Sequence, residues 1–121
     1  MTRTIVAGVD RSRAPLILFA SDAPHLVSAM LETGPDVLSV GASVDLAEAA
    51  RLAGRQASLQ GNLDPADLAR PREEIFARVT EMAARVAAAR GWIVNLGHGC
   101  TPATPVAGVR AFTDAVRALG S

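Results

Sequence analysis

Four short apolar runs recur along the chain, and each ends in small or polar residues. The first and the last run contain bulky or β-branched side chains, which is typical of buried strands. Each run has about four to six residues, and this length suits parallel strands. The pattern therefore predicts four strands, at Leu16–Ala20, Val37–Val40, Ala57–Gln60 and Trp92–Leu96.

The segments between and after these runs have apolar residues at helical spacing. The longest segment has acidic residues in its first turn and arginines near its end, as the helix dipole favours. Asp45 and Asp64 stand where helix caps are expected, and Gly34 and Gly54 stand where helices should end. The predicted helices are Pro24–Leu31, Val44–Leu52, a short turn from Asp64–Pro65, Pro71–Ala89 and Pro105–Leu119.

The last of these helices has an apolar stripe, formed by Val106, Val109, Phe112 and Val116. Steps of three and four residues place these side chains on one face of a helix.

Strands that alternate with helices predict an α/β fold of four βα units with parallel strands. The strand ends have a common sequence pattern, in which the apolar run is followed by small residues and then by a helix-capping residue. The four ends are FASD, VGAS, LQGNLDP and NLGHGCTP. These ends should meet at the carboxyl edge of the sheet, where α/β proteins bind ligands. Residues 1–15 are expected to be an N-terminal helix remnant (Thr4–Val9) and a polar connector (Asp10–Pro15).

Composition narrows the class of protein. Half of the 121 residues are hydrophobic, which argues against a disordered chain. The net charge is zero, aromatic residues are scarce and no basic stripe is present, so we expect no nucleic-acid partner. Met1–Asp10 is too short and too polar for a signal peptide, and no apolar run approaches the roughly 18 residues of a membrane span. With a single cysteine, these features predict a cytoplasmic protein without a membrane partner.

His98 lies between two glycines at the end of the last predicted strand, so it is either a turn residue or part of a site. Cys100 two residues later raises the possibility of zinc, but a structural zinc site needs about four ligands and His25 is the only other histidine. A half-buried thiol and no metal are the favoured interpretation. Gln60 and Asn62 end the third predicted strand, and Asn62 either binds a ligand or satisfies the turn before Asp64.

Three segments together resemble the uroporphyrinogen decarboxylase family. They are PLILFASDAPHLVSAMLETGPDVLSV (Pro15–Val40), VDLAEAARLAGRQASLQGNLDP (Val44–Pro65) and NLGHGCTPATPVAGVRAFTDAV (Asn95–Val116). The order and separation of QGNLDP and NLGHG are specific to that family. The resemblance runs from about Thr4 onward and covers the C-terminal part of the family's domain. Zinc-dependent methyltransferases of the same superfamily resemble the chain less well, because FASDAPH lacks their cysteine.

The resemblance implies a fold and an activity. The family forms a (β/α)8 TIM barrel, and the four strands here correspond to its last four. Residues 1–121 are therefore expected to be a single partial domain, a half barrel. The family's carboxy-lyase activity decarboxylates the acetate side chains of uroporphyrinogen III to give coproporphyrinogen III in haem and chlorophyll synthesis. It uses no metal or organic cofactor, since the protonated pyrrole accepts the electrons.

The resemblance also assigns candidate site residues. The histidine of NLGHG lines the family's substrate cleft, which makes His98 the leading substrate-binding candidate; Gln60 and Asn62 are weaker ones. The family's other site residues lie N-terminal to the region that this chain matches, so no catalytic residue is assigned. Arg3, Arg11 and Arg13 precede the first strand and are expected at the opposite edge of the sheet.

Half a barrel leaves two strand edges unpaired and its inner face uncovered. We therefore expect either self-association or pairing with a separate N-terminal half-barrel chain. The chain alone should not decarboxylate the porphyrinogen. The alternative is a non-catalytic protein of the same fold, either a truncated relic or a binding or scaffold module.

Overall fold

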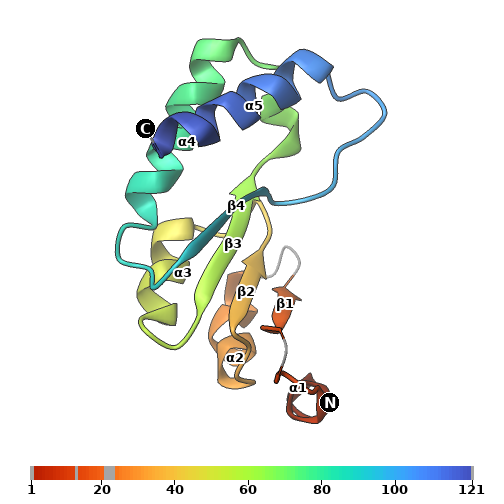
Figure 1. The fold of residues 1–121 in the computed structure, drawn as a ribbon, viewed down its shortest axis with the longest axis vertical. Coiled ribbons are helices and arrows are strands. Elements are labelled where there is room, and N and C mark those ends of the chain that lie inside the picture. Colours follow the sequence, from red (N-terminus) through yellow and green to blue (C-terminus); the bar gives the residue numbers. More distant parts are fainter. Residues whose placement is uncertain (1, 13, 21–23, 121) are drawn as a thin grey trace.

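The computed structural model describes residues 2–12, 14–20 and 24–120. Four parallel strands form one sheet, and strands that follow one another in sequence are neighbours in space (Figure 1). This confirms the predicted α/β class with parallel strands. The strands are β1 (Ile17–Ala20), β2 (Val37–Val40), β3 (Ser58–Leu63) and β4 (Trp92–Leu96).

Helices connect the strands and follow the last one. Asp45 accepts a hydrogen bond from the Ala47 N–H and caps α3, and Asp64 does the same for the Ala66 N–H at the start of η2, as predicted. None of the helices within the described residues is long and apolar enough to cross a membrane. The helices are α1 (Thr2–Gly8), the 3-10 turn η1 (Pro24–Leu26), α2 (Val27–Glu32), α3 (Leu46–Ala53), the 3-10 turn η2 (Pro65–Ala69), α4 (Arg72–Arg85) and α5 (Val106–Leu119).

Two element boundaries differ from the predictions for tertiary reasons. β3 extends to Leu63 because it pairs with β4 through that residue, so Gln60 is not its last residue and Asn62 also lies inside the strand. α4 ends at Arg85, and the Ala-rich residues 86–90 form turns that lead into β4. Helix propensity favoured a longer helix, but the chain must reverse here to enter the sheet.

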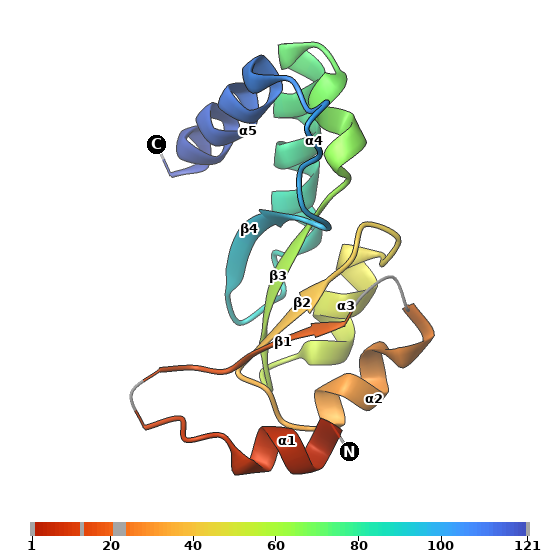
Figure 2. The same ribbon diagram turned by 90° about the vertical axis from the view of Figure 1, so that its right-hand side faces the viewer.

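The two faces of the sheet are different. On one face Leu38, Val40 and Leu59 are fully buried under the helices, and α2 and α3 lie on that side (Figure 2). On the opposite face Phe19 is 52% exposed and Ile93 43% exposed, because no element of the described chain covers it. The prediction that the first and last strands are buried is therefore wrong for this face, whereas an uncovered inner face was expected.

α5 packs on α4 and η2, and only part of the predicted stripe faces inward, since Phe112 is half-buried against the core. Its buried residues are Gly108, Ala111 and Ala115. Val106 is 68% exposed and Val109 also faces solvent. The small residues face inward because the helix lies directly on the backbone of η2, where a β-carbon at Gly108 would be 1.8 Å from the Leu68 carbonyl oxygen.

The loops that follow the strands lie at the carboxyl edge of the sheet, and the arginine that precedes the first strand lies at the amino edge, as predicted. At the carboxyl edge the loops after β2 and β4 touch, since a β-carbon on Gly97 would lie 2.4 Å from the Ala42 nitrogen. At the amino edge Arg11 binds the Asp36 carboxylate with its Nη2 atom at 2.8 Å, which confirms the place expected for that arginine. Arg13 lies outside the described residues.

Candidate functional site

The uncovered face of the sheet contains an open hollow of about 410 Å³. β1, β2 and β3 supply its floor, and the end of β4 with the loop that follows supplies its wall. The described residues that line it are Ile17, Phe19, Ser39, Gln60, Asn95, Leu96, Gly97, His98, Gly99 and Cys100. The structure therefore brings together two of the three residues predicted for substrate binding, His98 and Gln60.

His98 is exposed at the rim of this hollow. Its Nδ1 atom lies 3.2 Å from the Gly99 carbonyl oxygen, to which an Nδ1–H can donate. The Nε2 atom is then the nitrogen that remains for a ligand. When the ring is protonated, Nε2–H can donate to a carboxylate.

Gln60 is half-buried on the floor of the hollow, where its Nε2 atom donates to the Ser39 Oγ atom at 2.9 Å. Ser39 is buried, at 4% exposed. The two residues are direct partners in the register of β2 and β3. Sequence reasoning missed Ser39, although a serine within the apolar run VLSV is a sign that one face of the strand meets something polar.

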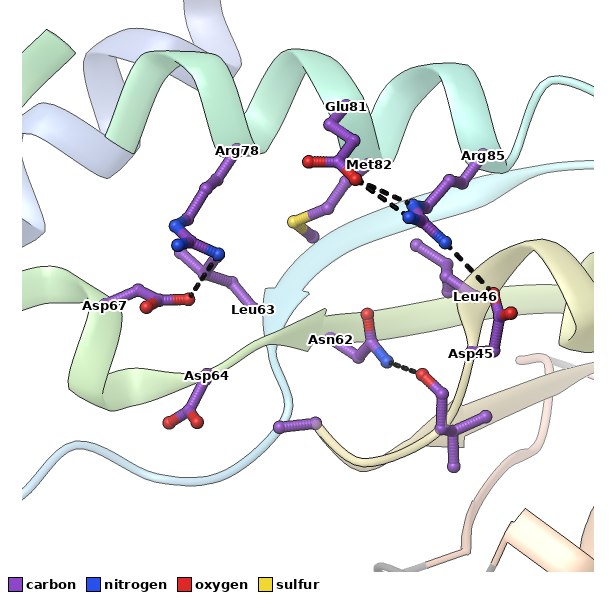
Figure 3. Close-up of a pocket in the computed structure, with 12 residues that line it drawn as sticks. Asp45, Leu46, Asn62, Leu63, Asp64, Asp67, Arg78, Glu81, Met82 and Arg85 are labelled. Atoms are coloured by element: carbon purple, nitrogen blue, oxygen red, sulfur yellow. Dashed lines mark hydrogen bonds and ion pairs between the residues drawn. The ribbon is translucent and has the colours of Figure 1, made fainter. Parts of the chain in front are cut away.

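Asn62 lies in a different place, in a cleft of about 390 Å³ between β3, α3 and α4. Figure 3 shows it across from Met82 and Arg85. Its Nδ2 atom donates to the carbonyl oxygens of Gly41, at 2.9 Å, and Val44, at 2.7 Å. Asn62 thus holds the loop between β2 and α3, and η2 is capped by Asp64 without it.

The charged groups in that second cleft are largely paired with one another. Arg85 binds Glu81 at 2.8 Å and Asp45 at 3.2 Å, and Arg78 lies 3.6 Å from Asp67 (Figure 3). The pairs with Asp45 and Asp67 join α4 to the N-cap of α3 and to η2. The arrangement serves to hold the helices together over the end of β3.

Cys100 is exposed, so the prediction of a half-buried thiol is wrong. The residue follows β4 in a loop that nothing in the described chain covers. Within the described residues no three histidine, cysteine, aspartate or glutamate side chains are grouped as metal ligands would be. Apart from His98 and Cys100, the described residues that line the hollow carry no ionisable side chain.

A lowered pKa is found at the opposite edge of the sheet, at Asp36. The Leu16 backbone N–H donates to Asp36 at 2.7 Å, and this bond, together with the Arg11 guanidinium, lowers the pKa of the Asp36 carboxyl group. The bonds tie the connector before β1 to the start of β2. Asp36 therefore supports the fold and takes no part in the hollow.

Known proteins resemble the chain in sequence and in structure. The family model for uroporphyrinogen decarboxylase (URO-D) matches residues 1–119. A uroporphyrinogen decarboxylase of Gloeobacter violaceus is 38% identical over 105 residues, which are 87% of this chain and 30% of that protein. One from Citrobacter koseri is 37% identical over 110 residues, 91% of this chain and 31% of that protein. The chain thus spans about three tenths of the length of these curated relatives.

A methyltransferase from Methanosarcina mazei has a similar structure, with a TM-score of 0.79. The match covers 99% of this chain and 35% of the methyltransferase, at 21% sequence identity. At this identity the likeness concerns the fold alone.

Proposed function

Since the chain belongs to the uroporphyrinogen decarboxylase family, we propose that it acts as the C-terminal half of a porphyrinogen-decarboxylating barrel. In this proposal residues 1–121 form one partial domain that works in the cytoplasm. The reaction is the carboxy-lyase step from uroporphyrinogen III to coproporphyrinogen III. The observation that supports it is the NLGHG loop, which holds His98 at the carboxyl edge of the sheet, beside the open hollow.

His98 is proposed to bind the substrate and not to perform the chemistry. Uroporphyrinogen carries carboxylates around its rim, and the Nε2 atom of His98 can donate to one of them. A hydrogen bond to a charged group contributes about 1.5–3 kcal/mol, which is roughly ten- to hundredfold in affinity. The decarboxylation releases carbon dioxide and leaves a methyl group after protonation, and the described residues of the hollow include no carboxylate or arginine for these steps.

The missing groups are proposed to come from a separate N-terminal half-barrel chain. The uncovered face and the two open strand edges are the surfaces that such a chain would cover, and the exposed residues Phe19 and Ile93 lie on that face. An eight-stranded barrel has one helix between each pair of neighbouring strands. Along the described chain one helix, α1, precedes the first strand β1, and another, α5, follows the last strand β4.

This count of helices distinguishes between the two expected partners. If a second copy of this chain closed the barrel, α5 of one copy and α1 of the other would compete for the same position at each seam. A partner with four strands and only the three helices between them leaves both positions to this chain. The heterologous half is therefore preferred to a homo-oligomer.

The test uses the 121-residue chain, alone and mixed with the part of a full-length family member that precedes its match to this chain. We expect coproporphyrinogen to form in the mixture and not with either half alone. His98→Ala should weaken uroporphyrinogen binding about tenfold or more. His25→Ala, at the other histidine, is the control and should have no effect. Turnover by the pure 121-residue chain would show that no partner is needed.

A non-catalytic binding or scaffold module is the second candidate. The observation that favours it is the lack of carboxylate and arginine side chains among the described residues of the hollow. Such a module would bind the porphyrinogen, or the partner half, without turnover in any mixture. Binding that is unaffected by His98→Ala would also favour this reading.

A further inference from the structure

The cleft between β3, α3 and α4 has a polar acceptor at its floor that no described residue engages. Asn62 is 8% exposed, and its Nδ2 atom is held by two backbone carbonyl oxygens, those of Gly41 and Val44. The Oδ1 atom is therefore the free end of this amide. Figure 3 shows that oxygen directed toward Met82 on α4, across the cleft of about 390 Å³. No buried side-chain oxygen of the described residues is both unpaired and sealed from solvent, so a molecule in the cleft can reach Oδ1.

The lining of this cleft has more negative than positive charge. Its charged residues are Asp45, Asp64, Asp67, Glu81, Arg78 and Arg85, which give a net charge of −2. Asp45 and Glu81 each bind Arg85 through one oxygen, Oδ1 and Oε1, and their second oxygens have no partner within the described part of the chain. Leu46 and Met82 add apolar surface to the same lining. This combination suits a small cation with N–H donors and a short apolar stem.

We propose that the cleft binds a small primary amine as its ammonium ion. One N–H donates to Asn62 Oδ1, the charge faces the carboxylates of Asp45 and Glu81, and the alkyl stem lies against the apolar lining. The cation is organic, because no three metal-binding side chains are grouped anywhere in the described residues. All of the lining comes from residues 42–85, on the side of the sheet that the helices cover. The site is therefore complete in this chain and does not depend on the proposed function.

Three probes separate hydrogen bonding from charge in a nuclear magnetic resonance titration of the ¹⁵N-labelled 121-residue chain. Propylammonium has both the charge and the N–H donors, tetramethylammonium has the charge alone, and propionate has the opposite charge. The readout is the side-chain NH₂ signal of Asn62, since a hydrogen bond at Oδ1 polarises the amide. The NH₂ signal of Asn95, which lines the hollow on the open face, is the internal control. Propylammonium is expected to move the Asn62 signal alone and to bind at least about tenfold more tightly than tetramethylammonium, while propionate moves neither signal.

Variants that each remove one negative charge test the role of the carboxylates. Asp45→Asn keeps the cap of α3, because asparagine caps a helix as well as aspartate does. It should weaken propylammonium binding about two- to fivefold, and Glu81→Gln should do the same. Glu74→Gln is the matched control and should have no effect, since Glu74 is exposed in the first turn of α4 and outside the lining. Added salt should weaken binding to the parent chain.

Three results would overturn the proposal. The first is an Asn62 signal that propylammonium does not move, and the second is equal affinity for propylammonium and tetramethylammonium. Both are measured on the parent chain and do not depend on how well a variant folds. The third is an equal effect of Asp45→Asn and Glu74→Gln. None of these results bears on His98, which lies at the hollow on the opposite face of the sheet.

Discussion

Replacement of Gly108 by alanine tests how α5 is held on the rest of the molecule. A β-carbon at this position would lie 1.8 Å from the Leu68 carbonyl oxygen and 2.7 Å from its carbonyl carbon. Carbon and oxygen normally approach to about 3.3 Å, so the alanine must push α5 away from η2 by roughly 1.5 Å. The obstacle is backbone, which cannot rotate aside as a flexible side chain can.

Two effects oppose each other in this substitution. Alanine favours the helix by about 0.5–1 kcal/mol relative to glycine. Overpacking costs about 1–3 kcal/mol and occasionally more, and the displaced helix also loses contacts at the buried residues Leu68, Ala111 and Ala115. Because the overlap is with backbone, we expect the packing loss to win. The free energy of unfolding should fall by about 2 kcal/mol.

Equilibrium unfolding in urea, followed by far-ultraviolet circular dichroism and by Trp92 fluorescence, measures this change. A loss of about 2 kcal/mol lowers the midpoint by roughly 1 M urea. Ala107→Gly, at the exposed neighbouring position, is the matched control and should cost about 0.5–1 kcal/mol through helix propensity alone. A Gly108→Ala midpoint equal to or above that of the parent chain would refute the packing described here.

Two further predictions concern hydrogen bonds at opposite edges of the sheet. Asn62→Ala should lower the free energy of unfolding by about 2–3 kcal/mol, because two backbone carbonyls lose their donor, whereas Asn95→Ala at an exposed site should cost under about 0.5 kcal/mol in the same urea assay. The Leu16 N–H and then Arg11 lower the pKa of Asp36 in the folded state. The ionised carboxylate therefore stabilises the fold at any pH above its unfolded pKa. This stabilisation is lost as the pH falls through the folded pKa. Asp36→Asn should therefore lower the melting temperature at neutral pH, and the difference in melting temperature between the variant and the parent chain should vanish in strong acid. A difference of the same size at every pH would contradict this.

The elements themselves were largely predictable, and the errors share a cause. Apolar periodicity and the caps at Asp45 and Asp64 are local properties, and the structure confirms them. The end of β3 was misjudged because Gly61 and Asn62 have low strand propensity, while pairing with β4 holds them in the sheet. The end of α4 was misjudged in the opposite direction, because alanine favours a helix that the entry into β4 interrupts.

The candidate site was predictable only where a motif marked it. NLGHG pointed to His98, and the structure places that residue at the hollow together with Gln60. Asn62 stands two residues from Gln60 in the chain, yet its side chain holds the loop after β2 in a separate cleft. Ser39 had no motif to mark it, since its importance comes from Gln60 on the neighbouring strand.

The sequence by itself determined the order of strands and helices, the caps, the edge of the sheet at which His98 lies and the family to which the chain is similar. These features depend on residues that are close in the chain. Only the tertiary structure decided which face of α5 is buried, which strand face stays open and which polar side chains meet there. Those outcomes depend on contacts between distant residues, such as Gly108 with Leu68 and Ser39 with Gln60. A stripe of valines looks like a core face in isolation, but backbone that packs this closely admits only small residues.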